Sequence, residues 1–167
     1  MRVVGAGSFV SPEQPTNIAE TTITRHKRIT RLLDDAYKTV RMGTYAIDCI
    51  IDKIEDKGLE NLMRKQNTYY LESTKSIEAI ANEYKHELTD INFMAKGSSY
   101  ISINMKTMLN NETSHIAQML IDGTTMGITT IIKERNENND LDNRLLGVID
   151  KIISYLEEFV ESLKEFL

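Results

Sequence analysis

The chain has few of the residues that interrupt helices or cross-link a fold. It has one cysteine, Cys49, in 167 residues, so it cannot form an internal disulfide. Its two prolines, Pro12 and Pro15, both lie near the start, which leaves everything after Pro15 free to be helical. No apolar run approaches the ~18 residues that a membrane-spanning helix needs. The sequence therefore favours a helical protein in a reducing, cytoplasmic setting with no membrane partner.

The chain also lacks a surplus of positive charge. It contains 20 Lys and Arg against 25 Asp and Glu, a formal net charge of -5. Binding of nucleic-acid phosphates wants a clear basic surplus, so we expect no nucleic-acid partner. The one basic cluster, residues 25–28 with Arg31, is interpreted as a solvated helix end.

What the chain does have is helical periodicity. Apolar residues recur at about 100° per residue in four long stretches, and no segment alternates as a strand does. We predict long helices at residues 24–56, 59–88, 112–134 and 141–166. A short connecting helix is predicted at residues 100–109. We interpret residues 1–23 as an ordered extension and residues 24–167 as one domain.

Four long amphipathic helices with short links predict an all-α fold, an up-down-up-down four-helix bundle. Gly58 is expected to stop the first helix. A faint repeat relates "GTYAIDCIIDK", which starts at Gly43, to "GTTMGITTIIK", which starts at Gly123. Two related hairpins would place the first helix beside the third, where these glycines would let the backbones approach closely. Without such a reason each mid-helix glycine costs about 1 kcal/mol.

This layout, with a mid-helix Gly-Thr in the first arm of each hairpin, resembles the ferritin-like superfamily. More narrowly, it resembles a bacterial ferritin-like family related to the rubrerythrins. The resemblance covers roughly residues 29–166 and is carried by "RLLDDAYKTVRMGTYAI", "GLENLMRKQNTYYLESTKSI" and "DGTTMGITTIIKE". It implies a two-hairpin bundle. In that family, carboxylates from the first and third helices and Glu-x-x-His from the second and fourth hold two metal ions.

The expected mid-bundle positions of this chain do not match that ligand set. Hard divalent ions need charged oxygen ligands, and these positions offer none. We therefore expect no cofactor and favour a non-catalytic role, through self-association or through binding of a protein or small ligand. The positions expected to face inward are Val40, Gly43, Thr44, Ile47, Gln66, Tyr69, Tyr70, Ser73, Gly123, Met126, Gly127, Val148, Ile152 and Tyr155.

Two Glu-x-x-His pairs leave an alternative open. Glu83 with His86 ends the second predicted helix, and Glu112 with His115 begins the third. If the two pairs shared one end of the bundle, they would form a shifted site for iron, manganese or zinc in a redox or metal-binding protein. The other interpretation is that all four are helix-surface and capping residues, since a motif with two fixed positions often occurs by chance.

Polar residues on the inner face of the second helix suggest a ligand pocket. Thr44, Gln66, Tyr70 and Ser73 would either line it or satisfy one another's hydrogen bonds.

A second apolar line on the third helix suggests a homodimer. Ala117, Ile121, Ile128 and Ile132 form this line, and Tyr45 lies on the outer side of the first helix. A bundle helix normally keeps that side polar, so we expect the extension or a second subunit to cover it.

One further segment resembles a known motif. "FMAKGSS", residues 93–99, is similar to the phosphorylatable stretch of histidine phosphotransfer domains, but Phe93 stands where the histidine is needed. A helix end explains the segment more simply.

Overall fold

The computed structural model describes residues 16–89 and 112–167, with side chains from Thr21 onward in those ranges. Within them the fold is all-α and has no strand. The long helices are α1 (Thr16–Ile50), α2 (Lys57–Glu83), α4 (Thr113–Asn136) and α5 (Asn143–Leu163), and the short 3₁₀ turns are η1 (Ile51–Lys53) and η3 (Lys164–Phe166). The prediction of an all-α fold with four long helices is confirmed. The predicted helix at residues 100–109, the motif at 93–99 and residues 1–15 lie outside the described residues.

The first helix starts earlier than its apolar pattern indicated. α1 begins at Thr16, directly after Pro15, and not at residue 24. Its side chains are all exposed over residues 21–27, and the buried stripe starts at Ile29. The pattern therefore records where α1 begins to pack against other helices, because an exposed turn of helix carries no apolar signal.

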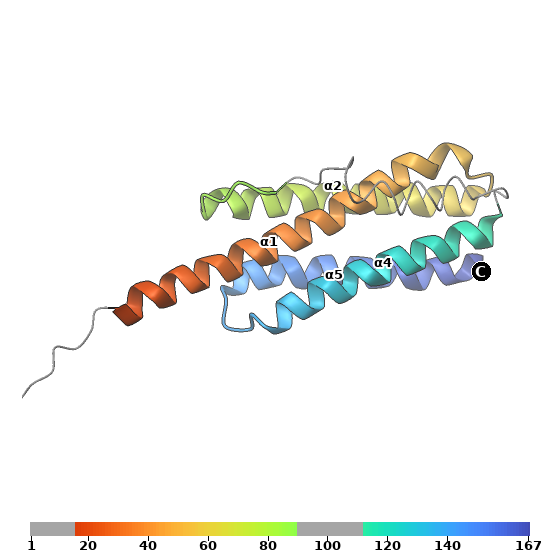
Figure 1. Cartoon of the computed structure of the whole chain (residues 1–167). Coiled ribbons are helices and arrows are strands. Elements are labelled where there is room, and N and C mark those ends of the chain that lie inside the picture. The colour runs from red at the N-terminus through yellow and green to blue at the C-terminus, as the bar shows by residue number, and fades with distance from the viewer. Residues whose placement is uncertain (1–15, 90–111) are drawn as a thin grey trace, which may run out of the picture.

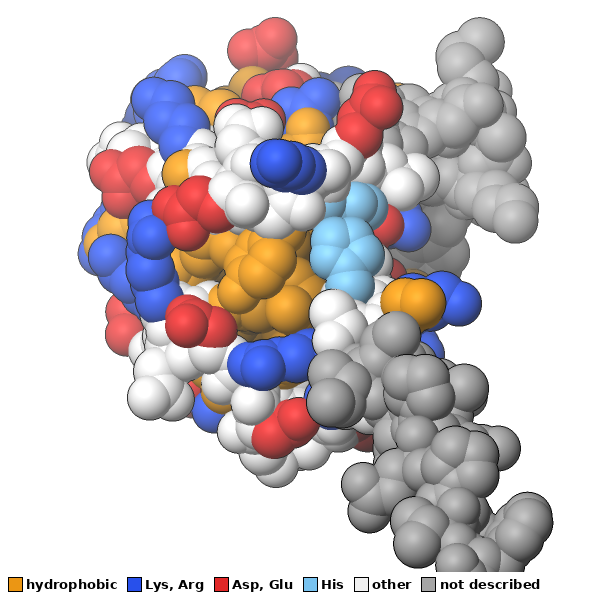
Figure 2. Space-filling model, turned by 90° about the vertical axis from the view of Figure 1, so that its left-hand side faces the viewer, with side chains coloured by type: hydrophobic (Ala, Val, Ile, Leu, Met, Phe, Trp, Pro, Cys, Tyr) orange, Lys and Arg blue, Asp and Glu red, His pale blue; other side chains and the backbone are white. Residues whose placement is uncertain are grey.

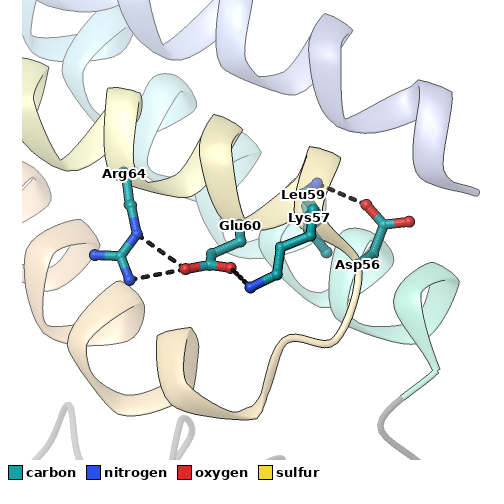
Figure 3. A network of polar contacts seen from close by, with 5 residues as sticks. All are labelled: Asp56, Lys57, Leu59, Glu60 and Arg64. Carbon is teal, nitrogen blue, oxygen red and sulfur yellow. Dashed lines mark hydrogen bonds and ion pairs between the residues drawn. The ribbon is translucent and has the colours of Figure 1, made fainter.

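The start of α2 is stabilised by a polar network (Figure 3). The carboxylate of Asp56 accepts a hydrogen bond from the backbone N–H of Leu59 at 2.8 Å, which satisfies one of the free donors of the first turn. Glu60 pairs with Lys57 at 2.7 Å and with Arg64 at 2.8 Å. These contacts therefore stabilise the end of the α1–α2 turn from which α2 begins.

Gly58 belongs to this start and is not the stop of the first helix that we predicted. It lies in the first turn of α2, after the cap residue Asp56. A Cβ at this position would lie 3.3 Å from the ring of Phe166, so the glycine makes room for the C-terminal turn to pack there.

The four helices lie side by side as two antiparallel pairs, α1 with α2 and α4 with α5 (Figure 1). Arg31, midway along α1, pairs with Glu134 near the end of α4, while Thr39, farther along α1, lies against Gly127, earlier in α4; these neighbours are therefore antiparallel too. At the end of α2, Glu83 pairs with Arg144 at the start of α5. Consequently α2 and α4 run in the same direction, and the predicted alternation of directions is wrong. Short links force antiparallel neighbours, but the long connection between α2 and α4 leaves room for a return along the bundle.

A single apolar core fills the space between the helices. The largest fully buried side chains come from all four helices: Leu32, Leu33, Ile50, Leu59, Met63, Ile77, Ile116, Ile131, Leu145, Ile149, Leu156 and Leu163. Tyr69 and Tyr155, which we expected to point inward, instead stack on each other between α2 and α5, with ring centroids 4.3 Å apart and both rings partly exposed. Among the described residues, no helix combines the length and apolar character that crossing a lipid bilayer requires.

Candidate functional site

A groove of about 300 Å³ opens between α1 and α4. Its walls come from those two helices, and its floor comes from Tyr70 of α2 with Leu156 and Phe159 of α5. The groove therefore reaches into the apolar core. Its wall residues are Asp35, Lys38, Thr39, Met42, Gly43, Ala46, Ile47, Met119, Leu120, Gly123, Thr124, Met126, Gly127 and Thr130.

Three glycines shape this groove, and each acts differently. Gly43 leaves space for the ring of Tyr70: a Cβ there would lie 2.8 Å from the phenol oxygen and nearer still to two ring carbons. Gly127 lets α4 approach α1, since its Cβ would lie 2.6 Å from Cγ2 of Thr39. A Cβ on Gly123 would meet nothing within 4 Å, so this position faces open space. Gly123 therefore does not serve the close helix contact that we predicted for it.

The floor of the groove carries a small polar cluster. Tyr70 is only 4% exposed, and burial raises the pKa of its phenol to about 12, although the neighbouring side chains of Gln66 and Thr124 act to lower it. Gln66 is 3% exposed and lies beside Tyr70 in the interior, without lining the groove. At neutral pH the floor therefore presents an uncharged phenol.

The rest of the lining is mainly apolar. Met42, Met119 and Met126 line the walls, and Met126 is 67% exposed. Methionine side chains are flexible and polarisable, and they adapt to ligands of different shape. The charged side chains among the described lining residues are Asp35 and Lys38, of opposite sign and both partly exposed. Such a groove suits a small molecule that is mostly apolar.

The predicted pocket residues are all buried, but only one of them lines the groove. Tyr70 forms part of the floor, and Gln66 lies beside it. Thr44 bonds back to the carbonyl of Val40 at 3.2 Å, and Ser73 is 6% exposed in the interior. The sequence had one signal for the groove itself, namely the glycines of the two Gly-Thr repeats. We read those as a close helix contact.

The two Glu-x-x-His pairs do not meet. Because α2 and α4 run in the same direction, Glu83 and His86 lie at one end of the bundle, while Glu112 and His115 lie at the other (Figure 1). Among the described residues, no three His, Cys, Asp or Glu side chains are grouped so that they could hold a metal ion. The hypothesis of a shared metal site at one end is therefore wrong.

The four residues of these pairs have other surroundings. His86 Nε2 lies 2.9 Å from Oδ1 of Asp34, a carboxylate that also accepts a hydrogen bond from the backbone N–H of Thr89 at 3.0 Å. Glu83 pairs with Arg144 at 2.7 Å. Glu112 directly precedes α4, and its side chain makes no capping bond.

Ion pairs surround the end of the bundle where α2 and α4 finish. Figure 2 looks onto this end and shows hydrophobic side chains gathered at its centre, within a ring of charged ones. Arg28 pairs with Asp140 at 2.7 Å, and Arg31 pairs with the buried Glu134. At this end, ion pairs therefore join α1 to α4 and to the turn that follows α4.

The predicted interface residues also have defined places. Ala117 has no exposed surface within the single chain, so it belongs to the core and cannot contact a second subunit. Ile121 and Ile128 pack partly against the core, and Ile132 and Tyr45 are partly buried. The buried face of α4 is therefore rotated from the one we predicted, toward Ala117, Thr124 and Glu134. We had assigned Gly123 and Met126 to that face, and both are exposed.

Comparison with known proteins gives no relative from which a role can be transferred. No protein-family model matches the chain, and searches of curated proteins and of solved structures returned no match. The function has to be inferred from the geometry of the groove.

Proposed function

We propose that this chain is a ferritin-like four-helix protein that acts without catalysis, by binding a small and mostly apolar molecule in the groove between α1 and α4. The single observation that carries the proposal is the groove itself, with its methionine-lined walls and its floor inside the core.

Two features support the ferritin-like part of the proposal. The helices form two antiparallel pairs, and α2 and α4 run in the same direction with residues 84–112 between them. Bundles of the ferritin type have one long crossover connection of this kind. The Gly-Thr repeat at Gly43 and Gly123 places related positions of α1 and α4 on opposite sides of one groove.

The size and chemistry of the groove support the binding part. A volume of about 300 Å³ is at the lower end of the range that small-molecule sites occupy. Gly123 exposes helix backbone to open space, where alanine would give a more stable helix by about 1 kcal/mol. Gly123 thus costs stability and leaves space in the groove. Binding of a ligand in that space would explain why a glycine stands at this position.

The metal-binding alternative loses its structural basis. It required Glu83, His86, Glu112 and His115 to share one end of the bundle, and they lie at opposite ends. We therefore do not retain a redox or metal-handling role for these residues.

Titration with N-phenyl-1-naphthylamine, an apolar probe that fluoresces when it leaves water, tests the proposal. We expect saturable binding to the full chain and a loss of at least tenfold in affinity for Gly123→Leu, whose side chain would fill the groove. Gly147→Leu is the matched control, because Gly147 also lies inside a helix with nothing within 4 Å of its Cβ position but does not line the groove. Equal affinity of both variants for the probe would refute the site.

A further inference from the structure

The floor of the groove indicates what class of molecule it takes. We propose that the ligand is a neutral molecule with one hydrogen-bond acceptor, such as a ketone or ester carbonyl, held by the hydroxyl group of Tyr70 on the floor while the methionine-lined walls cover its apolar part. This inference rests on the proposed function and assigns a chemical class to the same site.

The first step is the balance of donors and acceptors on the floor. Tyr70 and Thr124 line the groove, and Gln66 lies beside Tyr70 in the interior without lining it. The two lining groups are hydroxyls, each of which can donate a hydrogen bond. A ligand oxygen that reaches the floor would accept that bond.

The second step is charge. Tyr70 is buried and keeps its proton at neutral pH, because burial raises its pKa to about 12. It is therefore available as a donor. No charged side chain belongs to the described part of the floor, and the charged lining residues Asp35 and Lys38 have opposite signs. An ionised ligand group placed on this floor would lose its water without gaining a counter-charge, which is strongly unfavourable.

The third step is shape. Gly43 leaves space for the Tyr70 ring and so brings the phenol oxygen against α1, at the wall of the groove. Thr124 lines the opposite wall on α4. A carbonyl that reaches the floor between these two helices would meet hydroxyl groups, while the rest of the molecule would contact Met42, Met119 and Leu120.

Two fluorescent probes that differ only in a carbonyl test this proposal: 2-(dimethylamino)-6-propylnaphthalene, the parent compound, and the corresponding 6-propionyl ketone. We expect wild-type protein to bind the ketone about tenfold more tightly than the parent compound, the effect of one or two buried hydrogen bonds. In Tyr70→Phe the ratio of the two affinities should fall to within about twofold of one, with the parent compound bound as before. Thr44→Val is the matched control, since it removes a buried hydroxyl that does not line the groove, and it should keep the wild-type ratio.

The outcomes separate this inference from the proposed function. If both probes bind, and Tyr70→Phe does not change the ratio of their affinities, the carbonyl assignment is wrong while the groove remains a binding site. If neither probe binds, both proposals are wrong, including the case in which another segment of this chain fills the groove. The charge argument is tested by 2-naphthoate, which should bind at least tenfold more weakly than 2-acetylnaphthalene at pH 7. Equal binding of these two would contradict a neutral ligand.

Discussion

The ring of Tyr70, on α2, occupies the space that a side chain on Gly43 of α1 would need. The two residues come from neighbouring helices, and their contact sets the depth of the groove between α1 and α4. Because of this contact, a side chain at Gly43 would meet the Tyr70 ring, whereas one at Gly123 would meet nothing within 4 Å, although the two glycines stand at corresponding places in the sequence repeat.

This inequality predicts opposite effects of the same substitution. Gly43→Ala should destabilise the protein by about 1–3 kcal/mol, because the buried ring of Tyr70 has to move. Gly123→Ala should stabilise it by about 0.5–1 kcal/mol, because its Cβ meets nothing and alanine favours the helix. Urea unfolding followed by circular dichroism measures both. A stabilising Gly43→Ala would mean that Tyr70 does not lie against α1.

The ion pair between Arg28 and Asp140 predicts a pH dependence of stability. The hydrogen bonds from Arg28 hold the pKa of Asp140 down at about 2, against about 3.9 in an unfolded chain. A carboxyl whose pKa is lowered by folding stabilises the protein above its unfolded pKa. That contribution is lost as the pH falls from about 4 to about 2.

Asp140→Asn should therefore be less stable than wild type at pH 6, and the difference should shrink as the pH falls through this window. Arg28→Ala should give the same flattened profile, since it removes the partner. Urea unfolding at a series of pH values from 2 to 6 provides the data. Parallel profiles for wild type and Asp140→Asn would contradict the assignment.

The two histidines of the Glu-x-x-His pairs should behave differently when removed. His86→Ala should cost about 0.5–1.5 kcal/mol of stability, because it deletes a hydrogen bond to Asp34 of α1. His115 is exposed, so His115→Ala should change stability by less than about 0.5 kcal/mol. Thermal unfolding with and without a chelator compares them. A chelator-dependent loss common to both variants would revive a shared metal site.

The predicted homodimer stays a prediction. With Ala117 in the core, its remaining candidate residues are Tyr45, Ile121, Ile128 and Ile132, all partly buried. We expect light scattering to give twice the 19.1 kDa mass of one chain, and Ile132→Lys to shift the protein toward the monomer by placing a charge on that surface. A measured wild-type mass equal to that of one chain would contradict the predicted homodimer.

The sequence predicted most of the buried stripes because α1, α2 and α5 carry clear periodic patterns. On α1, Val40 and Ile47 were predicted to face inward and are buried there. On α4 the pattern is weaker, because small and polar residues such as Gly123 and Thr124 alternate with apolar ones. The sequence of α4 therefore contains two apolar lines that could each be the buried face. The line that we predicted is rotated from the face that is buried. The buried side includes Glu134, whose burial depends on its ion pair with Arg31, and no periodicity of apolar residues can show that.

Helix direction and the groove were harder to predict for a different reason. The direction of α4 depends on how the chain returns after α2. The length of that connection can be read from the sequence, but our prediction of alternating helix directions did not take it into account. The groove depends on which glycines face a neighbour and which face open space. Gly43 and Gly123 look alike in the sequence, and only the position of Tyr70 distinguishes them.

The pairing of the helices as two hairpins also has a consequence during synthesis. Domains tend to fold from the N-terminus as the chain is made, and α1 and α2 can pair as soon as both have left the ribosome. Their apolar stripes then remain uncovered until α4 and α5 follow, because the second hairpin provides the other half of the core. Because transiently exposed apolar surface favours aggregation, we expect the first hairpin made alone to be less soluble than the full chain.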